Sequence, residues 1–187
     1  MDRGRRVKVS KLLSFGLRHD PAALGLVLDA NGWVAVGDVL AGLAKHGEEV
    51  TRADLEEVVA TSDKQRFALS EDKARIRANQ GHSVDVDLGL APSVPPELLF
   101  HGTSAKVEDA IRREGLRAGE RTHVHLSADL GTATIVARRR AGPTVILRVR
   151  ARAMHDDGRP FFVSENGVWL TEHVPPEYVL PGEARSE

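Results

Sequence analysis

Two short clusters in the first half of the chain carry cationic side chains, and one of them also has a group that can exchange protons. The first is Arg18-His19, and the second contains Lys64 and Arg66. An imidazole titrates near neutral pH, and a guanidinium binds an anion as a fork. Each cluster also has a simpler interpretation, because cations suit the C-terminal end of a helix and a strand residue can face solvent. Judged alone, each cluster favours the simpler interpretation.

A polar segment follows at residues 77–83. It contains Asn79, Gln80 and His82, together with Gly81, which permits a close approach of the backbone to a ligand. These donors favour a loop that binds a phosphate or a ribose. The alternative is an ordinary turn that leads into a linker.

The tripeptide His101-Gly102-Thr103 lies at the end of an expected strand and before an expected helix. Such a strand-to-helix turn can present backbone N–H groups to an anion. The segment is too short for a phosphate-binding P-loop, and the sequence contains no Gly-rich dinucleotide-binding fingerprint. If the protein binds NAD, we expect no Rossmann domain.

His123, His125 and Ser127 alternate with apolar residues, so the pattern predicts that all three share one face of a strand. Two histidines on one face can bind zinc. The sequence offers no matching third and fourth ligands, so we expect these residues to line a cleft and we expect no metal.

Three consecutive arginines, residues 138–140, occupy the end of an expected helix at 129–140. They are compatible with a solvated helix end. The positions of Ile135 and Val136 indicate that Arg139 lies one turn further along their face.

The N-terminal half shows a helical pattern of apolar residues. We expect a first helix that ends at residues 18–20 before Pro21, a second that closes at Gly47, and a third that is capped by Thr51 with Asp54. Two strand-like pieces, 66–69 and 75–78, follow. Three helices and a small hairpin are typical of a winged helix, a common nucleic-acid-binding form.

Three prolines within residues 92–96 predict a domain junction near residue 92. After the junction, strands dominate at 98–101, 123–127, 145–150, 168–170 and 178–180, with helices at 105–114 and 129–140. Several short strands with two interposed helices predict a small α+β domain.

The composition excludes several classes of protein. The net charge of −1 argues against indiscriminate coating of nucleic acid, the absence of Cys excludes disulfides and thiolate nucleophiles, and no run of 18 apolar residues could span a membrane. The basic N-terminus is not followed by an apolar signal core. We therefore expect a cytoplasmic protein that has no membrane association.

The clusters occur in the same order as the motifs of a known enzyme family. The chain resembles the RNA 2′-phosphotransferase family (Tpt1/KptA) from about residue 8 to residue 182. The matching segments are Lys11-Leu12-Leu13-Ser14-Phe15-Gly16-Leu17-Arg18-His19, Asn31-Gly32-Trp33-Val34, Lys64-Gln65-Arg66-Phe67, Ile76-Arg77-Ala78-Asn79-Gln80-Gly81-His82-Ser83, Leu99-Phe100-His101-Gly102-Thr103, His123-Val124-His125-Leu126-Ser127 and Asn166-Gly167-Val168-Trp169-Leu170-Thr171.

The resemblance implies an α+β protein with a winged-helix RNA-binding lobe at residues 1–92 and an ADP-ribosyltransferase-like, NAD-binding lobe at 93–187. It also implies a two-step reaction. The RNA 2′-phosphate attacks C1″ of NAD and expels nicotinamide, and the ribose 2″-OH then attacks phosphorus. The products are 2′-OH RNA and ADP-ribose 1″,2″-cyclic phosphate.

The family uses a catalytic tetrad of Arg, His, Arg and Arg. Its motifs match Arg18, His19 and Arg66, and counting from Val136 makes Arg139 the fourth member. This sequence has Ala137 and Ala141 where the family has glycines, which leaves Arg138 as an alternative.

The resemblance also implies which residues bind the substrates. The residues expected to line the NAD cleft are His101, Gly102, Thr103, His125 and Ser127. The residues expected to contact substrate or phosphate are Asn79, Gln80, His82 and Arg138. NAD would be consumed as a co-substrate, RNA with a 2′-phosphate would be the partner, and the protein would be a monomer.

Two other functions fit parts of the pattern. An ADP-ribosyltransferase that stops after the first step would leave ADP-ribose on a nucleic-acid phosphate. A winged-helix regulator with a ligand-binding domain would perform no catalysis. The full set of tetrad residue types favours complete transfer over both.

Overall fold

The computed structural model describes residues 1–62 and 64–185. Helices and strands both contribute, as expected for an α+β protein. The chain forms two compact units, Met1–Gly89 and a second unit that begins at Leu90. None of the helices in the described residues is both long enough and apolar enough to cross a membrane.

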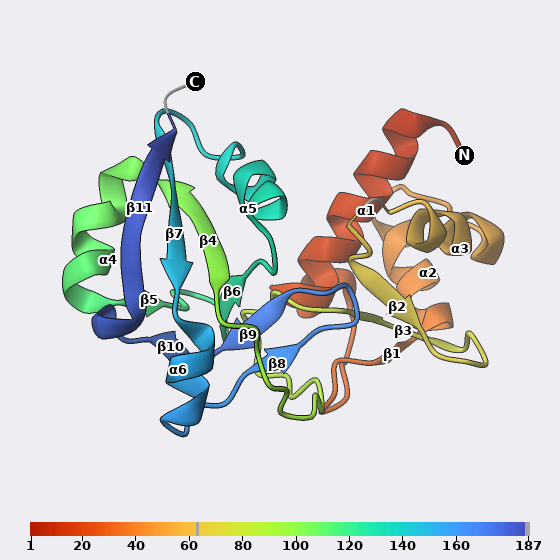
Figure 1. The fold of residues 1–187 in the computed structure, drawn as a ribbon. Coiled ribbons are helices and arrows are strands. Elements are labelled where there is room, and N and C mark those ends of the chain that lie inside the picture. The colour runs from red at the N-terminus through yellow and green to blue at the C-terminus, as the bar shows by residue number, and fades with distance from the viewer. Residues whose placement is uncertain (63, 186–187) are drawn as a thin grey trace. The chain divides into compact units, whose positions relative to one another are not determined.

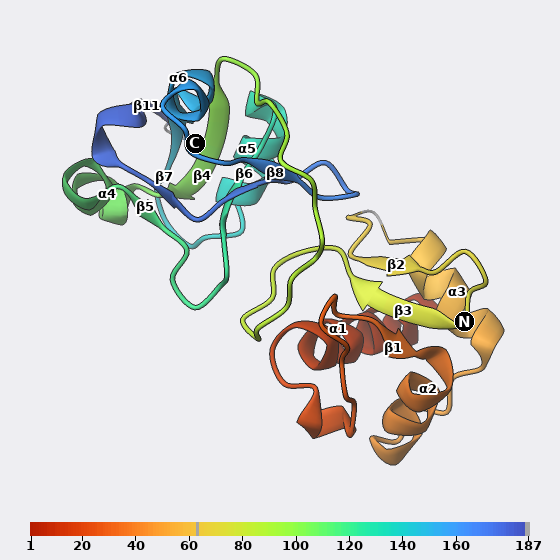
Figure 2. The ribbon, with the colours of Figure 1, turned by 90° about the horizontal axis from the view of Figure 1, so that it is seen from below.

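As far as unit 1 is described, it combines three α-helices with a small antiparallel sheet whose strand order is β1-β3-β2 (Figure 2). Its elements are α1 (Arg3–Arg18), the short 3₁₀ helix η1 (Ala22–Leu24), β1 (Val34–Ala35), α2 (Val36–Lys45), α3 (Arg52–Ala60), β2 (Phe67–Leu69) and β3 (Arg75–Ala78). The three predicted helices and both strand-like pieces are confirmed. The pattern did not predict η1 or β1.

Helix α1 begins at a side-chain cap and ends before a proline. The Asp2 side chain accepts a hydrogen bond from the Arg5 N–H at 3.0 Å. Val9, Leu13 and Leu17 lie on one face and are fully buried in the unit 1 core. The opposite face of α1 is therefore available to solvent or a ligand.

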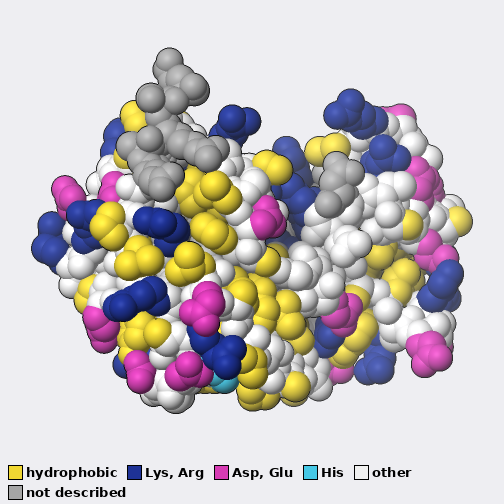
Figure 3. Space-filling model, in the orientation of Figure 1, with side chains coloured by type: hydrophobic (Ala, Val, Ile, Leu, Met, Phe, Trp, Pro, Cys, Tyr) yellow, Lys and Arg dark blue, Asp and Glu magenta, His cyan; other side chains and the backbone are white. Residues whose placement is uncertain are grey.

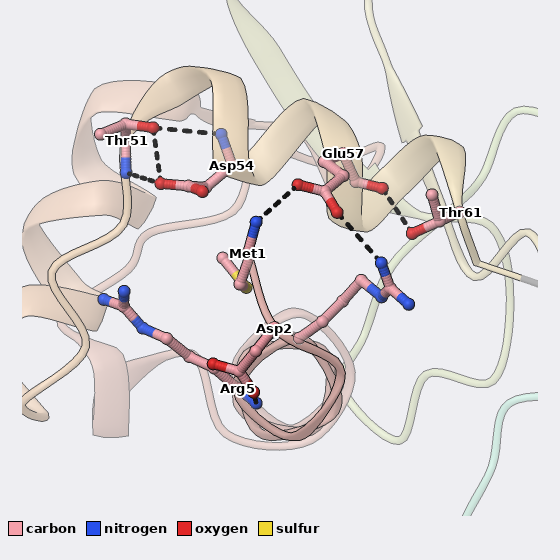
Figure 4. Close-up of polar contacts among 8 residues, drawn as sticks. Met1, Asp2, Arg5, Thr51, Asp54, Glu57 and Thr61 are labelled. Atoms are coloured by element: carbon pink, nitrogen blue, oxygen red, sulfur yellow. Dashed lines mark hydrogen bonds and ion pairs between the residues drawn. The ribbon is translucent and has the colours of Figure 1, made fainter.

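The predicted cap of α3 is confirmed. The Thr51 side chain accepts from the Asp54 N–H, and the Asp54 carboxylate accepts from the Thr51 N–H, each at 3.1 Å (Figure 4). One turn further along, Glu57 binds the N-terminal amino group of Met1 at 3.1 Å and Arg6 at 3.0 Å. These ion pairs attach the start of α1 to α3.

In the described residues of unit 2 the strands form three small antiparallel sheets, with strand orders β11-β7-β4, β6-β9-β8 and β10-β5. Its first elements are β4 (Leu99–Ser104), η2 (Ala105–Val107), α4 (Glu108–Glu114), β5 (Leu116–Arg117), β6 (Val124–Leu126), α5 (Leu130–Ala137) and β7 (Thr144–Val149). The remaining elements are α6 (Ala151–Asp156), β8 (Phe162–Val163), β9 (Trp169–Thr171), β10 (His173–Val174), η3 (Pro176–Tyr178) and β11 (Val179–Arg185). The strands predicted from alternation are confirmed, whereas α6, β5, β8 and β10 were not predicted.

Strand β7 separates two clusters of buried side chains in unit 2. Val145, Leu147 and Val149 point into the larger core, while Ile146 packs on the other face with residues of α5. Helix α5 lies beside β4 and β7, and α4 lies beside β11 (Figure 1). The β11-β7-β4 sheet is thus covered on both faces, which agrees with the nearly continuous run of apolar residues in β7.

Two expectations for unit 2 are wrong. Residues 101–103 do not form a strand-to-helix turn, because they lie inside β4 with Gly102 paired to Ile146. The glycine instead permits close packing, since a Cβ there would lie 2.1 Å from the Ala133 carbonyl oxygen of α5. The helix expected over 129–140 ends at Ala137, so the three arginines follow it.

Positive and negative side chains are interspersed over the face of the molecule shown in Figure 3. This mixture agrees with the net charge of −1. Any concentration of one sign must therefore be local.

Candidate active site

Unit 1 contains a cavity of about 620 Å³ beside α1. Arg18 and His19, at the end of α1, and Arg66, which precedes β2, all line it. The structure thus brings together three side chains, although Arg66 lies 48 positions after Arg18 in the sequence. Their guanidinium and imidazole groups offer the donors that a phosphate dianion requires.

The Arg66 carbonyl oxygen accepts hydrogen bonds that hold Arg18 and Arg66 next to each other. The Arg66 carbonyl accepts from Arg18 Nη2 at 3.4 Å and from the Asn79 N–H at 2.9 Å. Asn79 is 6% exposed, and its Nδ2 donates to the Gln65 carbonyl at 2.6 Å. Gln65 has a φ of 41°, which is uncommon for a residue other than glycine. Asn79 therefore stabilises the turn that carries Arg66.

Ser83 connects the loop after β3 to the end of α1. Its N–H donates to the Arg18 carbonyl at 2.9 Å, and its Oγ donates to the same oxygen at 3.4 Å. The Oγ also lies 2.9 Å from His19 Nδ1. If the hydroxyl proton is directed at the carbonyl, His19 Nδ1–H is the donor to Ser83 and Nε2 carries the lone pair.

His82 is buried beneath this cluster, with 1% of its surface exposed. Burial, followed by the positive charges of Arg18, Arg77 and His19, lowers its pKa to about 4. A neutral imidazole therefore lies beneath the cations and adds no further positive charge. Gln80, which precedes His82 in the same loop, is half-buried.

Unit 2 brings together a second group of the predicted residues. His101 Nδ1 lies 3.0 Å from the His125 carbonyl oxygen, which can only accept, so Nδ1 carries the proton. Burial lowers the pKa of His101, and the charges of Arg140 and Arg121 lower it further. His101 is consequently neutral near pH 7 and has an acceptor nitrogen at Nε2.

Arg121 is a member of this group that sequence reasoning missed. Its Nη1 lies 3.2 Å from His125 Nδ1, and because a guanidinium only donates, that nitrogen accepts. Partial burial and the charge of Arg140 lower the pKa of Arg121. Arg121 lies in a turn without periodicity, and the sequence offered no signal for it.

The alternation predicted at residues 123–127 is confirmed. Val124 and Leu126 are buried, while His125 is half-buried on the opposite face. Ser127 exchanges two backbone hydrogen bonds with Phe100, of 2.8 and 2.9 Å, which joins β6 to β4. This bridge sets His101 and His125 side by side. In the same strand as His101, Thr103 is 7% exposed.

The remaining cations of interest are Arg138, Arg139 and Arg140, and all three are exposed. Arg138 is the C-cap of α5, and its N–H donates to the Thr134 carbonyl. Arg140 lies close enough for its charge to affect both His101 and Arg121. The described residues contain no group of three or more His, Cys, Asp or Glu side chains arranged to hold a metal ion.

A family model described as RNA 2′-phosphotransferase, Tpt1/KptA family, matches residues 4–173 of this chain. The chain belongs to the RNA 2′-phosphotransferase family. The match includes the residues that line the unit 1 cavity from Arg6 onward and the His101 group of unit 2.

Bacterial relatives in the RNA 2′-phosphotransferase family cover nearly the whole chain. A probable RNA 2′-phosphotransferase of Streptomyces griseus is 54% identical over 96% of this chain and 98% of the relative. The corresponding protein of Trichormus variabilis is 52% identical with the same coverage. That of Rhizobium leguminosarum is 53% identical over 93% of both chains.

Proposed function

We propose that the protein is an NAD-dependent RNA 2′-phosphotransferase. It would convert a 2′-phosphorylated RNA and NAD into 2′-OH RNA, nicotinamide and ADP-ribose 1″,2″-cyclic phosphate. The observation that carries the proposal is the convergence of Arg18, His19 and Arg66 on one cavity in a member of this family.

The unit 1 cluster suits the phosphate that is transferred. Arg18 and Arg66 hold the phosphate dianion without giving up protons, and their fixed positions stabilise the charge that develops during phosphoryl transfer. His19 exchanges a proton at Nε2, either to activate the attacking hydroxyl or to protonate the leaving RNA oxygen. Ser83 positions the imidazole for this role through Nδ1.

The group of residues in unit 2 suits NAD. When bound there, NAD would supply the ADP-ribose that accepts the phosphate. Arg121 and Arg140 offer positive charge for a pyrophosphate, and neutral His101 offers an acceptor for a ribose hydroxyl. Thr103 and Ser127 belong to the same two neighbouring strand segments and complete the proposed lining. Arg139, or Arg138 in its place, would be the fourth tetrad residue.

The proposed function also assigns a role to each of the two units. The three helices and the β1-β3-β2 sheet of unit 1 correspond to the proposed winged-helix RNA-binding lobe. The small sheets of unit 2, with α4 and α5, correspond to the proposed ADP-ribosyltransferase-like lobe. Such a lobe would bind NAD without the Gly-rich fingerprint that a Rossmann domain uses.

The direct test is to incubate the protein with an oligonucleotide that carries one internal 2′-phosphate, with and without NAD. We expect loss of the 2′-phosphate only with NAD, together with equimolar nicotinamide and the cyclic phosphate product. An oligonucleotide with a 3′-phosphate is the matched control and should remain unchanged. Nicotinamide release with ADP-ribose retained on the RNA would instead identify an ADP-ribosyltransferase, and survival of the 2′-phosphate without nicotinamide release would refute both functions.

A further inference from the structure

The outer face of α1 forms a continuous wall of the unit 1 cavity. Its members are spaced three or four residues apart, so they follow one another along one side of the helix. They are Arg3, Val7, Lys11, Ser14 and Arg18. The cavity therefore extends from the proposed phosphate site at the end of α1 back to the first turn of the helix.

The opposite wall comes from the end of α3 and the segment that leads to β2. It contains Val58, Thr61, Ser62, Lys64 and Arg66. Among the described residues that line the cavity, six are Lys or Arg and none is Asp or Glu. A groove of one sign on a protein of net charge −1 is a local feature that favours a polyanion.

The groove cations differ in their ion pairing. Arg6 lines the groove but is partly neutralised, because it pairs with Glu57 at 3.0 Å. Within the part of the chain that the structure describes, neither Arg3 nor Lys11 has a carboxylate at ion-pair distance. Both are exposed.

Apolar side chains alternate with these cations. Phe15 is 45% exposed and Val7 is 47% exposed, and both line the groove. An exposed aromatic ring beside cations is the arrangement with which proteins bind single-stranded nucleic acid, since bases stack on the ring while cations follow the backbone. A free phosphate or a small anion would not require the apolar surface.

We propose that this groove binds the single-stranded RNA that flanks the 2′-phosphorylated nucleotide, with Arg3 and Lys11 opposite backbone phosphates and Phe15 against a base. The proposal rests on the proposed function, because Arg18, His19 and Arg66 hold the 2′-phosphate at one end of the same groove. Helix α1 has 16 residues and, at about 1.5 Å per residue, is about 24 Å long. That length matches about seven stacked nucleotides at about 3.4 Å each.

The first test measures the KM and kcat for 2′-phosphorylated oligonucleotides whose flanks are lengthened separately on the 5′ and the 3′ side. We expect the KM to fall about tenfold or more as one flank grows and to become constant near seven nucleotides. The other flank should have little effect, because one groove accepts one strand. A KM that is independent of both flanks would overturn the RNA groove but leave the proposed function intact.

The second test removes the groove cations in an Arg3→Ala, Lys11→Ala double variant. Its KM for the long substrate should rise towards the KM for the short one. The slope of log KM against log salt concentration should decrease by about 1.4, at about 0.7 for each lost phosphate contact on a single strand. Lys45→Ala is the matched control, since Lys45 is an exposed lysine of unit 1 that does not line the cavity.

The third test is Phe15→Ala, which should raise the KM for the long substrate about tenfold, since stacking of one base contributes about 1–3 kcal/mol. Phe15→Tyr should restore binding, because it keeps an aromatic face. Thermal unfolding confirms that each variant folds. If the double variant and Phe15→Ala both behave like Lys45→Ala on the long substrate, the groove does not bind RNA. If the parent protein turns over no 2′-phosphorylated substrate of any length, the proposed function itself fails.

Discussion

Unit 1 and unit 2 each bring basic side chains together, but the surroundings of these side chains differ. In unit 1, Arg18 and Arg66 line a cavity, and burial, followed by the charges of Arg18, Arg77 and His19, lowers the pKa of His82 to about 4. In unit 2, burial and neighbouring charge lower the pKa of both His101 and Arg121. Unit 1 therefore offers an anion guanidinium groups that line a cavity, whereas unit 2 combines its cations with hydrogen-bonding imidazoles.

This difference suggests a division of work under the proposed function. A dianionic phosphate that arrives from solvent is attracted by guanidinium groups that line a cavity open to it. The recognition of a ribose or an amide depends more on the placement of neutral donors and acceptors. Substitutions of the Arg18, His19 and Arg66 cluster should then affect phosphate transfer, and substitutions of the His101 group should affect nicotinamide release.

The largest expected effect comes from Arg66→Ala. Loss of a positioned cation should slow removal of the 2′-phosphate by about 10³-fold, with a smaller effect on nicotinamide release. Single-turnover reactions that follow nicotinamide and 2′-OH RNA separately will measure the two. His19→Ala should show the same separation.

Arg66→Lys is the matched control for Arg66→Ala. It keeps the charge and loses the fork, so partial recovery is expected. Full activity of both alanine variants would refute the assignment of Arg66 and His19. Equal loss of both products would contradict the division between the units.

The second prediction concerns the close packing of α5 on β4 in unit 2. Gly102→Ala should destabilise unit 2 by about 3 kcal/mol, because the new Cβ meets the Ala133 carbonyl oxygen and backbone must move. Unit 1 should be unaffected. Gly37→Ala in α2 is the control, since nothing lies within 4 Å of the added Cβ and alanine favours a helix.

Urea unfolding can separate the units because each contains one tryptophan, Trp33 or Trp169. In the Trp33→Phe background, the fluorescence of Trp169 reports on unit 2. A Gly102→Ala protein whose unit 2 unfolds at the same urea concentration as the parent would show that the packing is looser than the structure indicates.

The third prediction is a pH dependence of unit 1. The pKa of His82 is about 4 in the folded protein and about 6.5 in an unfolded chain, so between these values the unfolded state binds more protons. The contribution of His82 to the free energy of unfolding should therefore fall as the pH falls, by about 3 kcal/mol between pH 6.5 and pH 4.

His82→Gln should flatten this dependence when Trp33 fluorescence is followed in the Trp169→Phe background. His46→Gln replaces an exposed histidine of the same unit and should leave the slope as it is in the parent. If the slope is the same with and without His82, protonation of the buried imidazole is not what destabilises unit 1 in acid.

The parts of the fold that were predicted from the sequence have local causes. The reciprocal hydrogen bonds of Thr51 and Asp54 lie within one turn, and the apolar face of α1 repeats with the helical period. Strand β1 has two residues and exists because Val34 pairs with Ile76, which is 42 positions away. Pairing over such a distance leaves no local pattern.

The candidate site also combines features that a local pattern predicts with features that depend on distant contacts. Arg18, His19 and Arg66 were selected by motif, and their meeting depends on contacts from Asn79 and Ser83 that no periodicity reveals. Gly102 was interpreted as a turn because glycine favours turns, whereas its role is to admit a neighbouring helix. The three arginines after α5 are also difficult to interpret from the sequence. The helix ends earlier than expected, so the helical period does not give the direction of their side chains.

The last prediction resolves these arginines. Counting along the motif selects Arg139, with Arg138 as the alternative, while Arg140 is the one whose charge lowers the pKa of His101 and Arg121. We expect Arg139→Ala to lower kcat about 10²-fold, as for a lost transition-state contact. Arg140→Ala should instead raise the KM for NAD about tenfold, and Arg138→Ala should have little effect, because the helix cap that it forms uses its backbone. Steady-state kinetics of the three variants with a saturating RNA substrate distinguish these roles. A kcat defect confined to Arg140→Ala would move the fourth tetrad position to Arg140, the residue whose charge already acts on His101 and Arg121. The transition-state charge of unit 2 would then come from the same group of residues that provides its hydrogen-bonding imidazoles, rather than from a separate position after α5.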